Sequence, residues 1–287
     1  MKLEEIYEPI RENLRRTDDY LRDQIEAIGH ELGLGSKLDK FAKEAVRHLF
    51  ERPGKGLRPA LLLLSAGSTS PESLDWAGEA LVRSAAAVEL VHSASLIHDD
   101  VIDEAVRRRS AATVNRRFGT KTAILAGDIL FIHAFDVLAE LPGVAEERRL
   151  TLLQLFANLT KRMCYGEMLE QQARKKPKSL NRDGYIAILE DKTAMLMSVS
   201  CMCGALLAGG SEEIVENHRR FGLNFGLAYQ LADDYMDRDA VYRGSIDLLA
   251  EAHRHVLTAK DALCDSSAKL FKERLAALSD FVVDRAR

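Results

Sequence analysis

The stretch GEALVRSAAAVELVHSASLIHDDVIDE, residues 78–104, decides the class of fold. From Leu81 to Ile97 it is apolar on nearly every side, without the alternation of apolar and polar residues that marks a half-buried strand. A helix that is apolar all round belongs in the centre of a protein. This one ends in acidic residues, and buried carboxylates need a positive partner. The stretch therefore predicts a central helix that carries negative charge towards the interior.

Two aspartate clusters share one spacing. The first is Asp99-Asp100-Val101-Ile102-Asp103, and the second is Asp233-Asp234-Tyr235-Met236-Asp237. The outer aspartates of each cluster are four residues apart, so on a helix they project from one face and repel each other unless a cation lies between them. Mg²⁺ binds through a few carboxylates together with substrate phosphates. A single cluster fits a solvated helix end equally well, but two copies after apolar approaches favour a shared metal site.

Basic motifs near these clusters predict a polyanionic ligand. The loop Gly54-Lys55-Gly56-Leu57-Arg58-Pro59 enters a helix, where backbone N–H groups can add to anion binding. Arg107-Arg108-Arg109 follows the first cluster, and arginine forks match diphosphate oxygens. Lys192-Thr193 begins an uncharged stretch in which a lysine needs a partner. Each motif alone also fits an ordinary surface, so the inference depends on their combination.

The rest of the 287-residue chain predicts more helices within a single domain, residues 1–287. Apolar residues recur at helical spacing, and segments of about 15 to 30 residues lie between glycine and proline breaks. No low-complexity segment or flexible linker divides the chain. The predicted fold is all-α, a single large helical bundle around a central cavity.

Composition argues against several kinds of partner. A net charge of -4 and a pI near 6.1 give no electrostatic reason to expect nucleic acid or an anionic membrane. Residues 1–25 carry charges throughout, so no signal peptide is expected. Thr193 to Gly210, the longest uncharged stretch, is the one candidate membrane span, but its marginal length favours a buried helix and no stable membrane insertion. The cysteines lack disulfide or zinc spacing, which predicts a cytoplasmic setting.

Together these motifs resemble those of the trans-polyprenyl diphosphate synthases, which include farnesyl, geranylgeranyl and octaprenyl diphosphate synthases. The resemblance runs from about Gly54 to Asp237 and resumes weakly from Gly244 to Arg287. It implies the isoprenoid synthase fold, a homodimer, and Mg²⁺-dependent condensation of isopentenyl diphosphate with an allylic diphosphate. The motifs that carry it are GKGLRP at 54–59, LIHDDVIDEAVRRR at 96–109, LAGDILF at 125–131, DKT at 191–193 and YQLADDYMD at 229–237.

The resemblance also implies a role for individual residues. The metal ligands would be Asp99, Asp103 and Asp233, supported by Asp100 and Asp237. Isopentenyl diphosphate would be held by Lys55, Arg58, His92 and Arg109. The allylic diphosphate would contact Arg108, Lys192 and Gln230, with Thr193 beside the forming bond. The implied catalytic set is Asp99, Asp103, Arg108, Lys192, Thr193, Gln230 and Asp233.

The residues before the first cluster predict a long product. The growing tail is expected to follow the helix face of Asp99, past Ser95 and its neighbour Ala94 one turn back and Val91 two turns back. Short-chain relatives commonly block this path with aromatic side chains, whereas residues 94 and 95 are small here. Small residues there would also suit close helix packing. The candidates for a deeper floor are Val91, Met163 and Met168.

The chain departs from the family pattern after Asp237. A Gly-Lys pair, an aspartate and a GKxTLP-like helix start are absent, which amounts to about 35 to 45 residues, or two or three helices. Either a natural deletion or the omission of a longer segment would explain this. Gly244 to Asp247 resembles the start of a late family helix, which favours an omitted segment near 237–244.

Two other functions fit parts of the pattern. A non-catalytic subunit of a heteromeric prenyl synthase would tolerate the missing segment, but it is not expected to keep both aspartate clusters. A terpene cyclase would use the same fold and metals, but its second metal motif is usually an Asn/Ser/Glu arrangement. The predicted function is therefore a prenyltransferase that makes a linear, long-chain, all-trans polyprenyl diphosphate.

Overall fold

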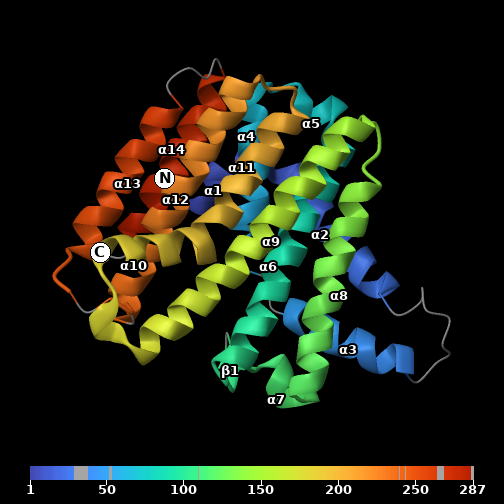
Figure 1. Cartoon of the computed structure of the whole chain (residues 1–287). Helices are drawn as coiled ribbons and strands as arrows, with labels where there is room; N and C mark the ends of the chain where they lie inside the picture. The colour runs from blue at the N-terminus through green and yellow to red at the C-terminus, as the bar shows by residue number, and fades with distance from the viewer. Residues whose placement is uncertain are drawn as a thin grey trace.

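Helix α6 (Gly78–Ile102) lies in the middle of the computed structural model, with other helices packed around it (Figure 1). Most of its residues are buried, because apolar side chains occur on every face of the helix. Helices α2, α4, α8 and α11 contact it. The prediction of a central helix in an all-α bundle is confirmed.

The structure describes residues 1–28, 38–51, 54–108, 110–238, 240–242, 244–263 and 268–285. Helices account for nearly all of the regular structure in these ranges. Their bounds are α1 Leu3–Ile6, α2 Arg11–Ala27, α3 Leu38–Phe50, α4 Leu57–Thr69, α5 Ser73–Trp76, α6 Gly78–Ile102, α7 Val114–Phe118, α8 Thr120–Ala139, α9 Glu146–Lys175, α10 Arg182–Leu189, α11 Met195–Leu207, α12 Glu212–Asp237, α13 Leu248–Ala262 and α14 Lys269–Asp284. Short 3₁₀ turns cover Glu8–Ile10 and Pro177–Ser179, and a π-helical turn covers Glu190–Ala194.

A hairpin of two short strands, each two residues long, follows α6, and the sequence did not predict it. Strand β1 (Arg107–Arg108) pairs antiparallel with β2 (Ala111–Ala112), so Arg107 lies opposite Ala112. Ser110 in the connection has a φ of 65°, the left-handed conformation that short turns use. The hairpin turns the chain back at the end of α6, and this return places Arg108 near the first aspartate cluster.

Helix α11 is buried along its length, which confirms the interpretation of the uncharged stretch after Lys192. The choice of that stretch as the one candidate membrane span was wrong. Among the described residues, α6 and α8 are instead long and apolar enough to cross a membrane by length and hydropathy alone. Buried core helices pass the same test, and the apolar window of α6 is 72% buried. The window of α8 is only 44% buried, so this helix has an exposed apolar face.

Residues 238, 240–242 and 244–247 stand in the sequence between α12 and α13. Helices α12 and α13 pack against each other, and Tyr242 in the connection stacks on Tyr185 at a centroid distance of 5.6 Å. Residues 239 and 243 lie outside the described residues. The continuity of this connection is therefore not described, and the omitted segment near 237–244 stays a prediction.

Candidate active site

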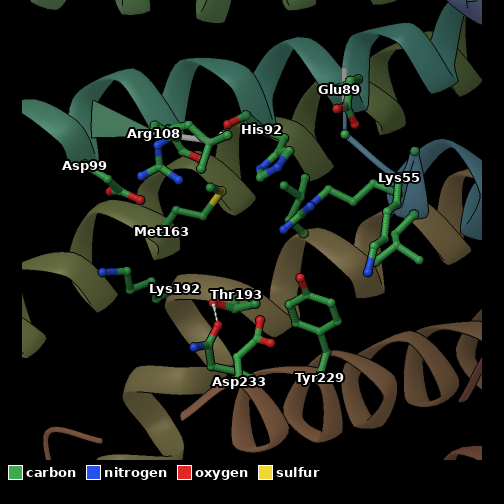
Figure 2. A pocket seen from close by; sticks show the side chains of 18 residues that line it. Lys55, Glu89, His92, Asp99, Arg108, Met163, Lys192, Thr193, Tyr229 and Asp233 are labelled. Atoms are coloured by element: carbon green, nitrogen blue, oxygen red, sulfur yellow. Dashed lines mark hydrogen bonds between the residues drawn. The ribbon is translucent and has the colours of Figure 1, made fainter. Parts of the chain in front are cut away.

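A cavity of about 590 Å³ opens among α4, α6, α9, α11 and α12 (Figure 2). Four apolar side chains, Leu57, Leu96, Met163 and Leu196, share its wall with charged groups. The structure thus combines phosphate-binding chemistry with a surface for a hydrocarbon chain. The predicted site residues in the wall are Lys55, Arg58, His92, Ser95, Asp99, Arg108, Lys192, Thr193, Gln230 and Asp233.

The charged groups lie at two separate ends of the cavity. Figure 2 shows Lys55 at one end, Asp99 and Lys192 at the other, and His92 between them. Glu89, which the sequence analysis did not select, lies near Lys55 on the same helix as His92. The separation leaves room for two anionic groups with reacting carbon atoms between them.

The loop that carries Lys55 is held in place by local geometry. Gly56 caps the N-terminus of α4 with a φ of 60°, which glycine adopts without strain. The hydroxyl of Tyr7 donates a hydrogen bond to the carbonyl oxygen of Lys55 at 3.1 Å. Arg58 is in the first turn of α4. The predicted partner Arg109 lies outside the described residues, so its role stays a prediction.

Asp99 is the aspartate of the first cluster that faces the cavity. Burial raises the pKa of Asp99 to about 6, because the carboxylate loses water, although Lys192 lowers it. Asp103 is placed differently from the prediction. Helix α6 ends at Ile102, so Asp103 is the capping residue, exposed and outside the cavity wall. Its carboxylate lies 3.5 Å from the side-chain nitrogen of Gln171.

Asp100 does not share the orientation of Asp99. It is buried, lies outside the cavity wall, and accepts hydrogen bonds from Nε of Arg108 at 3.0 and 3.1 Å. Neighbouring residues of a helix point in different directions, which explains the divergence. Asp100 therefore positions Arg108 in this structure, in contrast to the supporting metal role that the resemblance implied.

Lys192 is held by two glutamates that the sequence analysis missed. Its Nζ lies 2.6 Å from a carboxylate oxygen of Glu167 and 2.6 Å from one of Glu170, both on α9. Burial alone would lower the pKa of Lys192, but Glu170 and Asp99 raise it above its usual value. The lysine belongs to the π-helical turn before α11, a feature that often marks functional sites. The spacing of Glu167 and Glu170, three apart on one helix face, was the available signal.

The aspartates of the second cluster also lie in different environments. Asp233 faces the cavity, whereas Asp237 is exposed at the end of α12 and outside the wall. Burial raises the pKa of Asp233, and Arg285 lowers it. Asp234 accepts hydrogen bonds from Tyr185 at 2.5 Å and Gln230 at 2.8 Å.

Gln230 and Thr193, two predicted site residues, contact each other. The side-chain oxygen Oε1 of Gln230 accepts a hydrogen bond from the hydroxyl of Thr193 at 2.9 Å. This bond joins α12 to the π-helical turn at the floor of the cavity. The bond therefore holds Thr193 and Gln230 in a fixed position relative to each other.

The residues chosen for chain length do not share one face. Ser95 lies in the cavity wall, but Val91 and Ala94 are fully buried elsewhere. Successive helical residues rotate by about 100°, so Ala94 turns away from Asp99, whereas Val91 lies one turn before Ser95 on nearly the same face, outside the cavity wall. Met163 lines the cavity, as expected for a floor residue. Met168 is 68% exposed, so its choice as a floor candidate was wrong.

The site is compatible with a divalent metal that also binds substrate phosphates. Among the described residues, no group of three or more Asp, Glu, His or Cys side chains forms a ready metal cage. Mg²⁺ does not require one, since it often uses one or two carboxylates together with phosphates and water. Asp99 and Asp233 both face the cavity and offer carboxylate oxygens from two different helices. The donor set therefore fits Mg²⁺.

One protein family and several individual relatives match the sequence of the chain. The family described as Polyprenyl synthetase matches residues 39–241. The all-trans-nonaprenyl-diphosphate synthase (geranyl-diphosphate specific) of Rhodobacter capsulatus is 32% identical over 234 residues, 82% of this chain and 65% of that protein. The geranylgeranyl diphosphate synthase of Methanosarcina mazei is 34% identical over 197 residues, 69% of this chain and 59% of that protein. The chain thus spans less than two thirds of the length of these relatives.

A solved structure supports the same fold. The geranylgeranyl pyrophosphate synthetase of Pyrococcus horikoshii superposes with a TM-score of 0.86 at 23% identity, covering 99% of this chain and 100% of that one. At this level of identity the likeness concerns the fold alone. The helical arrangement around the cavity is therefore shared with a solved structure.

Proposed function

Because the chain belongs to the polyprenyl synthetase family, we propose that it condenses isopentenyl diphosphate with an allylic diphosphate to make a linear polyprenyl diphosphate. The observation that carries this proposal is the two-ended cavity. Lys55 lies at one end, Asp99 and Lys192 lie at the other, and Asp233 lies between Lys192 and Tyr229 (Figure 2), while Arg58, in the first turn of α4, adds a second cation to the wall. Such an arrangement suits two diphosphates held apart.

Mg²⁺ is the proposed cofactor at the aspartate end. Asp99 and Asp233 would hold it, and Asp103 and Asp237 lie at the ends of the same helices. When bound, the metal would neutralise the charge that develops on the departing diphosphate. Lys192 adds a fixed positive charge beside the same end of the cavity.

The protein groups have separate tasks in the proposed reaction. Lys55, Arg58 and His92 bind isopentenyl diphosphate, while Lys192 and Arg108 bind the allylic diphosphate. The allylic C–O bond breaks to leave a carbocation, the double bond of isopentenyl diphosphate attacks it, and a proton passes to the departed diphosphate. The apolar part of the wall keeps water from the cation. No protein nucleophile takes part.

Calorimetric titration of the metal-free protein tests the assignment of the two ends. Isopentenyl diphosphate is expected to bind in the presence of EDTA, since its site consists of cationic side chains. A non-ionising allylic analogue, farnesyl thiolodiphosphate, is expected to bind measurably only when Mg²⁺ is added. Equal dependence of both ligands on Mg²⁺ would contradict the assignment.

We propose a long-chain product because the cavity wall near Asp99 carries a small side chain. Ser95 lies there one helical turn before Asp99, and its hydroxyl donates a hydrogen bond within its own helix, to the carbonyl oxygen of His92 at 2.8 Å. Ser95→Phe is expected to shorten the product, because the ring would occupy the path of the tail. Chain length is measured by chromatography of the dephosphorylated products. Ser95→Ala is the control and should keep the wild-type length, whereas an unchanged length in Ser95→Phe would exclude this path.

A homodimer is proposed on the exposed apolar face of α8. Leu125 and Ile132 are seven residues apart, so they lie on one face, and they are 61% and 63% exposed. Exposed apolar faces of this kind mark protein interfaces. Leu125→Glu is expected to weaken the dimer by about 2 kcal/mol or more, since it places a charge in the interface. Light scattering after size exclusion measures the mass.

Leu257→Glu is the matched control for the dimer prediction. Leu257 is 63% exposed on α13, so the same chemical change is made at an equally exposed leucine. The control should keep the mass of the dimer. A dimeric Leu125→Glu protein would show that another surface forms the interface.

Two further expectations remain proposals. A cytoplasmic location is consistent with Cys201 and Cys203, which are free and buried in α11. Microscopy of the tagged protein in its natural cell tests this location, which a membrane or extracellular signal would exclude. An omitted segment after Asp237 is tested by intact mass spectrometry of the protein from its natural source. A mass above 32.0 kDa, with new peptides after Asp237, would support the segment.

A further inference from the structure

The end of the last helix lies against the second aspartate cluster. Arg285 caps the C-terminus of α14, and its Nη2 lies 2.6 Å from Oδ1 of Asp233. The same guanidinium lies over the ring of Tyr229, 4.2 Å from the ring centroid. Tyr229 and Asp233 are one turn apart on α12, so together they hold the guanidinium by its charge and by its flat face. This contact is long-range in sequence and specific in geometry.

A second residue of α14 fixes this position. Phe281 lies one helical turn before Arg285, and the Nζ of Lys55 lies over its ring at 5.7 Å from the centroid. The final turns of α14 therefore contact the cationic end of the cavity through Phe281 and the aspartate end through Arg285. These two contacts at the C-terminal end of α14 keep the guanidinium near Asp233 without help from any ligand.

The pair is protected from solvent more than most ion pairs of this chain. The side chains of Arg285 and Asp233 are 20% and 24% exposed, compared with 35% and 51% for the Arg219 and Glu216 pair on α12. Screening by water is weaker at lower exposure, so the attraction is correspondingly stronger. Arg285 thus supplies Asp233 with positive charge in the substrate-free protein.

We propose that Arg285 is the resident counter-ion of Asp233 and competes there with a divalent metal, so that Arg285 lowers the metal affinity of the second cluster. This inference depends on the proposed function, because it takes Asp233 to be a metal ligand. Both cations are attracted to the carboxylate of Asp233, where the guanidinium already lies 2.6 Å from Oδ1, and two cations near one carboxylate repel each other. The Arg285–Asp233 contact therefore opposes metal binding.

Binding of Mn²⁺ alone to the substrate-free protein tests the proposal without any turnover. Free Mn²⁺ is measured by electron paramagnetic resonance for the wild type and for Arg285→Gln. The variant is expected to bind about tenfold more tightly at the site that involves Asp233, a typical size for coupling between two ligands. Equal affinity of the two proteins would overturn the proposal.

Three further variants separate the counter-ion from a purely structural role. Arg285→Lys keeps the charge and should bind Mn²⁺ nearly as the wild type does. Arg219→Gln removes an arginine from an ion pair on the same α12 helix and should not change the affinity. In an Asp233→Asn background, Arg285→Gln should have no effect. Tighter binding in Arg219→Gln, or a persistent effect in the Asp233→Asn background, would contradict the proposal.

The same titration distinguishes failure of this inference from failure of the proposed function. No Mn²⁺ binding by either the wild type or Arg285→Gln would contradict the inference, whereas the proposed function would be contradicted only if Mn²⁺ also failed to bind together with farnesyl thiolodiphosphate. Binding of equal strength would contradict the inference alone. Circular dichroism checks that each variant is folded. If Arg285→Gln is not folded, Arg285→Lys is compared with the wild type instead. Weaker Mn²⁺ binding by Arg285→Lys than by the wild type would count against the proposal.

Discussion

Asp99→Asn is expected to lower the rate of prenyl transfer about a thousandfold while the fold stays intact. The amide has nearly the shape of the carboxylate, so packing at the end of α6 is kept. Its negative charge is lost, however, and Asp99 is the aspartate of the first cluster that faces the cavity. A metal with one of its two cavity-facing carboxylates missing would stabilise the departing diphosphate poorly. Steady-state assays at saturating substrate measure the effect.

Asp183→Asn is the matched control for this prediction. Asp183 is 89% exposed on α10 and lies outside the cavity wall, so the same chemical change is made far from the proposed metal. The control should retain the wild-type rate. An Asp99→Asn protein with more than about a tenth of the wild-type rate would remove Asp99 from the catalytic set.

Gly204→Ala is expected to destabilise the fold by about 3 kcal/mol. A Cβ at Gly204 would lie 2.0 Å from the carbonyl oxygen of Leu62 and 2.9 Å from its carbonyl carbon. These atoms are backbone of α4, so relief requires that whole helices α4 and α11 move apart. Such a change should lower the apparent melting temperature by roughly 6 °C, as followed by circular dichroism.

Gly78→Ala controls for the change of glycine to alanine in a helix. At Gly78 the nearest atom to the added Cβ would be Nη1 of Arg16, at 3.3 Å, the far end of a flexible side chain. The expected change in unfolding free energy is below about 1 kcal/mol. If Gly204→Ala were as stable as Gly78→Ala, the close contact of α4 with α11 would not limit stability.

The sequence predicted the parts of the structure that depend on local pattern. A run of apolar residues on every face predicted α6 as the central helix, and the repeated aspartate spacing predicted that α6 and α12 meet at one cavity. Asp99 and Asp233 lie in its wall as expected. Asp103 keeps the helical spacing, since its N–H bonds to the carbonyl oxygen of Asp99 at 2.8 Å, but it is exposed outside the cavity wall, and its role as a metal ligand stays a prediction.

The partners of Lys192 and Asp233 could not be predicted, because they depend on packing between distant segments. Lys192 meets Glu167 and Glu170 because α9 passes close to the π-helical turn. A Cβ at Gly166 would lie 2.6 Å from the backbone nitrogen of Lys192, which shows how near the two segments are. Arg285 reaches Asp233 across more than fifty residues of sequence. The spacing of Glu167 and Glu170 showed only that they share a helix face, and it did not identify Lys192 as their partner.

The measurement that most directly tests the central claim is a product assay. Purified protein is incubated with Mg²⁺, radiolabelled isopentenyl diphosphate and farnesyl diphosphate, and the products are separated by length. The predicted result is a ladder of prenyl diphosphates that extends beyond the addition of one unit and disappears when EDTA removes the metal. The absence of any elongation, with geranyl and geranylgeranyl diphosphate as well as farnesyl diphosphate, would contradict the account and favour a non-catalytic subunit.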